Sequence, residues 1–141
     1  MSVLQKELST AITAVVRASR LTQKIFKSLQ SGQKGSAGTV TKVDKSPVTI
    51  ADYGSQAIVN AVLRSVFPAD PIVGEEDSNE LRGNQDLRQK VWDLVLSTLQ
   101  ATPAKEIEHS GGEIRSEEEM LDFIDCGNYA GGSKGRNLPR S

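Results

Sequence analysis

The N-terminal part of the chain repeats its apolar positions with the spacing of a helix. After Leu4 the steps are three or four residues, so these positions fall on one side of a helix. They are Leu8, Ile12, Val15, Ser19, Thr22, Ile25 or Phe26, and Leu29. The pattern predicts a long helix that ends at residues 31–38, SGQKGSAG, where three glycines indicate a loop.

A second helix is predicted after an extended segment. The sequence TVTKVDKSPVT, residues 39–49, is rich in β-branched residues and contains Pro47, which favours a short extended segment or a hairpin. Residues 51–67, ADYGSQAIVNAVLRSVF, then return to helical spacing, and Pro68 closes the helix. Asp52 lies in the first turn of this predicted helix. Its apolar side consists of Ile58, Val59, Val62, Leu63 and Val66.

The next segment predicts one strand and a third helix. PIVG, residues 71–74, has the composition of a short buried strand, and a polar loop follows it. Residues 86–102, DLRQKVWDLVLSTLQAT, have the periodicity of a third helix. Its apolar positions are Leu87, Val91, Leu94, Val95 and Leu99.

A fourth helix is predicted in SEEEMLDFIDCGN, residues 116–128. Ser116 and Glu119 have the spacing of a capping box at its start, and Gly127 provides a stop signal at its end. The residues expected to face inward are Met120, Leu121 and Ile124. The sequence therefore predicts an α+β fold with about four helices and about two or three short strands.

Charge and cysteine content narrow the class of protein. Seventeen Lys and Arg residues against 18 Asp and Glu residues give a formal net charge of −1. The basic residues are spread along the chain, so we expect no nucleic-acid partner. The single cysteine, Cys126, allows no internal disulfide and is typical of a reducing compartment. Lys6 and Glu7 interrupt any signal peptide, and no apolar run approaches the ~20 residues of a membrane span. We therefore expect a soluble, cytoplasmic protein with no membrane partner.

The candidate chemistry is concentrated in carboxylates. Asp52 and Thr49 lie where a loop meets a helix, a place that commonly presents polar groups to a ligand. A carboxylate there also simply stabilises the helix start by about 0.3–1 kcal/mol. Glu75 and Glu76 follow the predicted strand, and neighbouring strand residues point to opposite faces, so at most one of the two faces a shared site. Such oxygen ligands suit Mg²⁺. A solvated acidic turn that includes Asp77 is the alternative, and these residues alone favour it.

Two other motifs are interpreted as having no catalytic role. GGSKG, residues 131–135, lacks the preceding strand and the Gly-Lys-Ser/Thr order of a phosphate-binding loop. His109 is the only histidine, and it lies in a polar stretch without a nearby cysteine, which favours a surface role.

Three separated segments keep an order and spacing that resemble the 3′(2′),5′-bisphosphate nucleotidases, especially the fungal ones. They are SPVTIADYGSQ at 46–56, FPADPIVGEED at 67–77 and IDCGNYAGGSKGR at 124–136. This family belongs to the lithium-sensitive, Mg²⁺-dependent phosphatases of the inositol monophosphatase superfamily. The resemblance extends from the first helix to about Arg136, and it implies the N-terminal portion of a layered αβαβα sandwich.

The resemblance also implies an activity and roles for single residues. The activity is Mg²⁺-dependent hydrolysis of the 3′-phosphate of adenosine 3′,5′-bisphosphate and of its sulfated form, 3′-phosphoadenylyl sulfate, in sulfur assimilation. Asp52 matches the aspartate that orients and deprotonates the attacking water within the metal cluster. Glu75 matches a direct Mg²⁺ ligand, and Glu76 matches the second glutamate, which is assigned a supporting role. Thr49 is predicted to support the site because it lies at the same junction as Asp52. An inositol phosphate phosphatase of the same superfamily is the closest alternative.

The end of the sequence departs from the family pattern. After Arg136 the family continues with a tryptophan-containing strand and an Asp-Pro-Ile-Asp-Gly-Thr motif that supplies further metal ligands, whereas this chain reads NLPRS. We therefore expect residues 1–136 to be the N-terminal part of a sugar-phosphatase-type domain and 137–141 a divergent tail. We also expect an incomplete sheet and impaired activity. Helix faces that the family covers with its sheet would be exposed, which makes self-association or a non-catalytic interaction role the second class of function.

Overall fold

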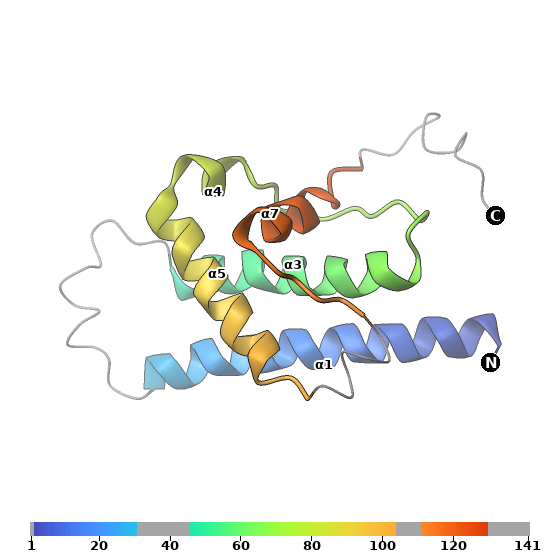
Figure 1. The fold of residues 1–141 in the computed structure, drawn as a ribbon. Helices are drawn as coiled ribbons and strands as arrows, with labels where there is room; N and C mark the ends of the chain where they lie inside the picture. The colour runs from blue at the N-terminus through green and yellow to red at the C-terminus, as the bar shows by residue number, and fades with distance from the viewer. Residues whose placement is uncertain (1, 31–45, 104–110, 130–141) are drawn as a thin grey trace.

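The computed structural model describes residues 2–30, 46–103 and 111–129, and these ranges contain five α-helices (Figure 1). The helices are α1 (Val3–Gln30), α3 (Pro47–Val66), α4 (Asn79–Gly83), α5 (Gln85–Gln100) and α7 (Glu117–Asp125). The four predicted helices are confirmed as α1, α3, α5 and α7. The short helix α4 lies in a segment that the sequence pattern assigned to a polar loop. The predicted tail at 137–141, GGSKG and His109 lie outside the described residues.

Helix α3 lies between α1 and α7 (Figure 1). It runs beside α1 in the opposite direction, and α7 packs on its other side. Helix α5 crosses this stack and contacts α1, α3 and α7. Because α3 and α5 contact every other large helix, they carry most of the core.

The core consists mainly of apolar side chains from these four helices, together with Leu81 of α4 and Ile114 of the segment before α7. Its fully buried members include Leu21 of α1, Ile58 of α3, Val91 and Val95 of α5, and Met120 and Ile124 of α7. Each such side chain contributes about 1.5–3 kcal/mol when it is removed from water. The predicted inward positions of the fourth helix are therefore confirmed. On α3, Ile58 and Val62 are buried, whereas Val59, Leu63 and Val66 are only partly covered.

Helix α3 begins earlier than the sequence pattern predicts. Ser46 is its N-cap, and the Ser46 side chain accepts a hydrogen bond from the backbone N–H of Thr49. Pro47 occupies the first helical position, where its missing N–H costs nothing and its fixed φ favours the helix. The extended segment predicted for residues 39–49 is therefore wrong at 47–49, while residues 39–45 lie outside the described part. Asp52 consequently lies in the second turn of α3, and the prediction of a first-turn position is wrong.

The described residues contain no β-sheet, so the predicted strands and the sandwich layers are not found in this part of the chain. The PIVG segment makes one isolated antiparallel bridge, between Val73 and Asn128, and Val73 is 74% exposed. A strand gains its stability from neighbouring strands, and the backbone of this segment pairs only with the short stretch that follows α7 in the described residues. The helical half of the predicted fold class is confirmed, and the sheet half is wrong for the described residues.

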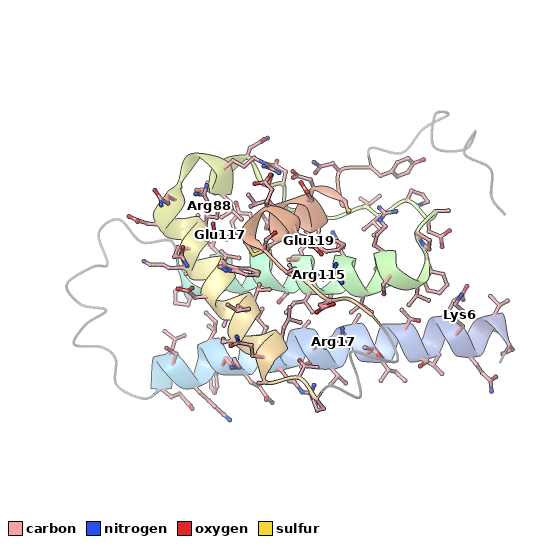
Figure 2. All side chains as sticks on the ribbon, viewed as in Figure 1. Lys6, Arg17, Arg88, Arg115, Glu117 and Glu119 are labelled. Atoms are coloured by element: carbon pink, nitrogen blue, oxygen red, sulfur yellow. The ribbon has the colours of Figure 1, made fainter. Side chains whose placement is uncertain are left out.

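Helix α1 uses a polar and small-residue face to contact the core. Its buried positions are Thr10, Ala14, Arg17 and Leu21. The Nη1 group of Arg17 donates a hydrogen bond of 2.7 Å to the carbonyl oxygen of Gly111 (Figure 2), which ties α1 to the segment before α7. Gly112 has a φ of 82°, and an added Cβ there would lie 2.7 Å from Arg17 Nη1. Glycine is therefore required at this contact.

The apolar line predicted along α1 is exposed on the opposite side of the helix. Leu8, Ile12, Val15, Phe26 and Leu29 are between 50% and 63% exposed. The expectation that apolar helix surface is uncovered is thus met on α1. No helix in the described ranges has the length and apolar content needed to cross a bilayer.

Helix caps and one ion pair fix the positions of α5 and α7. The Asn84 side chain accepts from the N–H of Leu87, and the Ser116 side chain accepts from the N–H of Glu119, which confirms the predicted cap of the last helix. Arg88 Nε of α5 lies 3.5 Å from Glu117 Oε2 at the start of α7 (Figure 2). A carboxylate in the first turn also interacts favourably with the helix dipole.

Candidate functional site

Five carboxylates gather where α3 faces the loop that precedes α4. We call Asp52, Glu75, Glu76, Asp77 and Glu80 the acidic cluster. Asp52 comes from α3, the next three residues come from the loop, and Glu80 comes from α4. The sequence prediction named Asp52, Glu75 and Glu76, and the structure adds Asp77 and Glu80 to the charges that act on Glu76.

Glu76 is the electrostatic centre of the acidic cluster. It is half-buried, whereas the other four are exposed. Burial raises the pKa of the Glu76 carboxyl above its ordinary value of 4.5, and the negative charges of Glu75, Asp52, Asp77 and Glu80 raise it further. Burial and like charges both disfavour the ionised form. Ionised Glu76 is therefore destabilised in the chain by itself, and a bound cation would relieve this.

Tyr53 of α3 contacts the acidic cluster through Glu80. It is buried, and its hydroxyl group donates a hydrogen bond of 2.8 Å to Glu80 Oε2. Burial, the bond to Glu80 and the surrounding negative charges all raise the pKa of Tyr53. Tyr53 therefore remains a neutral hydrogen-bond donor at physiological pH.

Arg82 of α4 lies next to the acidic loop in the sequence, and it interacts with Glu118, Asp122 and Asp125 of α7. In the described ranges no three His, Cys, Asp or Glu side chains are arranged to hold a metal ion. The donor set consists of hard carboxylate oxygens, which suits Mg²⁺ in its chemistry. Its geometry supplies only part of a coordination shell, so water and further ligands must fill the rest.

Thr49 has a local structural contact. Its hydroxyl group lies 3.1 Å from the hydroxyl group of Ser46, and its N–H donates to Ser46 Oγ at 3.3 Å. These contacts belong to the cap of α3. The supporting role assigned to Thr49 stays a prediction.

Gln56 is a site residue that the sequence reasoning missed. Its Nε2 group donates to the carbonyl oxygen of Glu76 at 2.7 Å and to that of Ile124 at 2.9 Å. Its Oε1 atom accepts from the N–H of Glu76 at 3.0 Å. Residues four apart share a helix face, so the separation of Gln56 from Asp52 was the available signal. The partners of Gln56 are backbone groups, which every residue has. The spacing alone therefore could not show that Gln56 binds the loop.

The far end of the acidic loop is held by α7. Asp125 accepts from the N–H of Ser78 at 2.8 Å and from its hydroxyl at 2.6 Å. Arg82 Nε donates to Ser78 Oγ at 2.7 Å, and Arg82 Nη2 lies 3.3 Å from Asp125 Oδ2. Burial acts to raise the pKa of Asp125, but the bonds from Ser78 and the charge of Arg82 prevail and lower it. Asp125 is therefore an ionised anchor for the loop.

The near end is held by two glycines. The N–H of Gly74 donates to the carbonyl oxygen of Gly127 at 2.8 Å, and the N–H of Tyr129 donates to the carbonyl oxygen of Ile72 at 3.3 Å. Together with the bridge between Val73 and Asn128, these bonds bring the PIVGEED and IDCGN motifs side by side. Two of the three segments that carried the sequence resemblance thus lie side by side.

The amino-acid sequence of this chain is similar to those of several known proteins. The chain is 53% identical over 131 residues to the 3′(2′),5′-bisphosphate nucleotidase of Schizosaccharomyces pombe, a match that covers 92% of this chain and 36% of the relative. The resemblance inferred from the motifs is confirmed. Similarity to 3′(2′),5′-bisphosphate nucleotidase 1 of Candida albicans is 46% over 132 residues, covering 94% of this chain and 35% of the relative. The chain is also 43% identical over 137 residues to 3′(2′),5′-bisphosphate nucleotidase 1 of Arabidopsis thaliana, a match that covers 94% of this chain and 36% of the relative.

The bisphosphate nucleotidases that match are enzymes, and their names describe phosphatases. The chain spans about 36% of the length of the first of these curated relatives. No family model matches the chain. The match to these relatives covers 92% of this chain, so it includes the acidic cluster and the residues that hold its loop.

Proposed function

We propose that the acidic cluster is part of the Mg²⁺ site of a 3′(2′),5′-bisphosphate nucleotidase. Two kinds of support combine here. The negative charges of the other four carboxylates all act on half-buried Glu76, and the named relatives are nucleotidases. In this proposal Glu75 is a direct ligand of the metal. Asp52 also binds the metal and accepts the proton of the attacking water, and Glu76 supports these two carboxylates.

The chemistry needs well-placed oxygens and little else from the protein. Mg²⁺ takes one or two protein carboxylates and fills its octahedral shell with water and phosphate oxygens. When bound, the ion lowers the pKa of a coordinated water and neutralises charge on the phosphoryl group. The exposed carboxylate of Asp52 accepts the proton that the attacking water loses. Half-buried Glu76 adds negative potential, and Thr49 orders the start of the helix that carries Asp52.

The substrate in this proposal is adenosine 3′,5′-bisphosphate or its sulfated form, 3′-phosphoadenylyl sulfate. Removal of the 3′-phosphate from adenosine 3′,5′-bisphosphate gives AMP, and the reaction belongs to sulfur assimilation in the cytoplasm. An inositol phosphate phosphatase is the alternative within the same chemistry. The 141-residue chain by itself has little or no activity in this proposal, because the described carboxylates complete no metal shell.

Metal binding tests the proposal directly. The 141-residue chain is titrated with Mg²⁺ by calorimetry, and with Mn²⁺ as a paramagnetic probe of the carboxylates. We expect weak binding that Asp52→Asn and Glu75→Gln each reduce. Asp70→Asn is the matched control, because Asp70 is exposed and is absent from the charges that act on Glu76. Equal binding by all four proteins would refute the assignment.

An activity assay separates substrate classes. Phosphate release is measured with adenosine 3′,5′-bisphosphate, 3′-phosphoadenylyl sulfate and inositol monophosphate in the presence of Mg²⁺. Any turnover should favour the two nucleotides and disappear in Asp52→Asn. Preference for inositol monophosphate would assign the chain to the alternative substrate class.

The exposed line on α1 favours a second candidate function, association of two copies of the chain. From Leu8 to Leu29 the positions of this line are four and three residues apart in turn, which is the repeat of a left-handed coiled coil, and the two central positions are the polar Ser19 and Thr22. The small residues Ala11 and Ala18 flank the line, so a second helix can approach closely. The opposite face of α1 already contacts the core, so a helix from another copy is the partner that this spacing fits.

Sedimentation velocity over a range of concentrations tests the association. We expect a dimer that Ile12→Lys weakens by at least tenfold, because a charge then lies on the apolar line. Ser9→Lys is the matched control, since Ser9 is exposed on α1 beside the line. A monomer at all concentrations, or equal effects of the two variants, would refute the dimer.

A further inference from the structure

The backbone of Glu76 is held on both sides by one side chain. The N–H of Glu76 donates to Gln56 Oε1 at 3.0 Å, and the carbonyl oxygen of Glu76 accepts from Gln56 Nε2 at 2.7 Å. The same Nε2 group reaches the carbonyl oxygen of Ile124 at 2.9 Å. One amide from α3 therefore fixes both the acidic loop and the end of α7.

Fixing the backbone of Glu76 also fixes the direction of its neighbours. A rotation of the peptide groups at Glu76 would change the directions in which the side chains of Glu75 and Glu76 point. The two hydrogen bonds to Gln56 oppose such a rotation, because both peptide groups that flank the Glu76 Cα are held at once.

The glycines around Gln56 give independent support. An added Cβ on Gly74 would lie 2.8 Å from Gln56 Cδ, and one on Gly127 would lie 3.0 Å from Gln56 Nε2. A Cβ at such distances forces the neighbouring atoms to move. Two segments of the chain thus leave room for this amide where any larger residue would displace it.

We propose that Gln56 is a positioning residue for the acidic cluster. It holds the loop so that the Glu75 carboxylate faces the cation and the Glu76 carboxylate stays half-buried behind it. The statement about the loop stands on the geometry alone, and the consequence for metal affinity rests on the proposed function. Outer contacts that orient metal ligands typically change metal affinity by 10–100-fold when they are removed.

Asn60 provides a matched control on the same helix. It is buried one turn after Gln56, and its Nδ2 group donates to the carbonyl oxygen of Phe123 at 2.8 Å. Gln56 and Asn60 therefore make the same kind of bond from α3 to neighbouring carbonyl groups of α7. Only Gln56 also binds the acidic loop. Loss of Asn60 measures the cost of detaching α7, and loss of Gln56 measures that cost together with release of the loop.

The experiment compares Gln56→Met and Asn60→Leu in the 141-residue chain. Both substitutions remove the amide and retain most of its volume. Amide hydrogen exchange is followed at Glu76 by NMR, and Mg²⁺ affinity is measured by calorimetry on the same samples. We expect exchange at Glu76 to become about fivefold to tenfold faster in Gln56→Met, and Mg²⁺ affinity to fall by about tenfold or more. Asn60→Leu should leave both values near those of the unmodified chain.

A second variant keeps the test decisive if Gln56→Met does not fold. Gln56→Glu retains the acceptor for the Glu76 N–H but places an oxygen against two carbonyl oxygens, so exchange at Glu76 should again become faster. Unchanged exchange at Glu76 in the folded Gln56 variant, or equal changes in the Asn60 variant, would overturn the proposal. If the unmodified chain binds no Mg²⁺ while the exchange results are as expected, the metal proposal fails and the positioning role stands.

Discussion

Gly54 is the position where α1 and α3 approach most tightly against the core. It is buried in α3, and an added Cβ would lie 2.8 Å from Leu21 Cδ1 and 3.4 Å from Val95 Cγ2. Leu21 is fully buried, so its side chain has little room to withdraw. Gly54→Ala therefore adds a methyl group where two helices already touch. Gly83→Ala is the matched change, because nothing lies within 4 Å of the Cβ position at Gly83 in α4.

Two opposing free energies decide the outcome. Replacing glycine by alanine inside a helix favours folding by about 1 kcal/mol. Overpacking a filled core by one methyl group typically costs about 1–3 kcal/mol. At Gly54 the net effect is a loss of stability of up to about 2 kcal/mol. Gly83 is the last residue of α4, so alanine there gains at most about 1 kcal/mol, and no overpacking opposes this gain. The two variants should therefore differ by up to about 3 kcal/mol in their free energies of unfolding.

Thermal and urea unfolding of the two variants measure this difference. One kcal/mol corresponds to about 4 °C in a domain of this size, so Gly54→Ala should melt several degrees below Gly83→Ala. The double variant Leu21→Val with Gly54→Ala should lose less than the sum of its single changes, because valine lacks the Cδ1 atom that the new methyl group meets. If Gly54→Ala is as stable as Gly83→Ala, the close packing of α1 on α3 is wrong.

Three further predictions concern the acidic loop and α7. Because the pKa of Glu76 is raised in the folded chain, ionisation of Glu76 lowers the free energy of unfolding at neutral pH. This loss disappears as the pH falls through the folded pKa towards 4.5. Glu76→Gln should therefore raise the melting temperature at pH 7 in EDTA, and this advantage should be absent near pH 4. Asp125 has a lowered pKa, so its ionised carboxylate stabilises the fold fully above its ordinary pKa of 3.8, and this stabilisation is lost as the pH falls through the lower folded pKa. Asp125→Asn should therefore reduce the free energy of unfolding at pH 7 and make stability depend less on pH below 3.8. Ser116→Ala should cost about 0.5–2 kcal/mol in urea unfolding, and Ser116→Asp, which keeps the cap, should cost much less.

The sequence predicted the helices where local signals agree with one another. Periodicity located α1, α3, α5 and α7, and the Ser116 cap was placed correctly. The start of α3 was missed because Pro47 was interpreted as a break in an extended segment. A proline that follows a serine is equally typical of a helix start. Helix α4 is too short for periodicity to reveal, so its segment was assigned to a loop.

The candidate site was predicted in part for similar reasons. Runs of acidic residues are visible in a sequence, so Asp52, Glu75 and Glu76 were named in advance. What holds them in place is mostly backbone. Gln56 binds the two peptide groups of Glu76, and Gly74 binds the carbonyl group of Gly127. Every residue offers the same peptide groups, so composition and spacing could not reveal these contacts.

The packing of Gln56 between Gly74 and Gly127 has a consequence for how such sequences diverge. A side chain acquired at position 74 would occupy the space of the amide, so it could be retained only with a shorter residue at position 56. A side chain at position 127 would also lie 3.0 Å from the backbone of Gly74, so loss of the amide alone does not free that position. Among homologues positions 56 and 74 should therefore change together, whereas position 127 should stay glycine whichever residue occupies position 56.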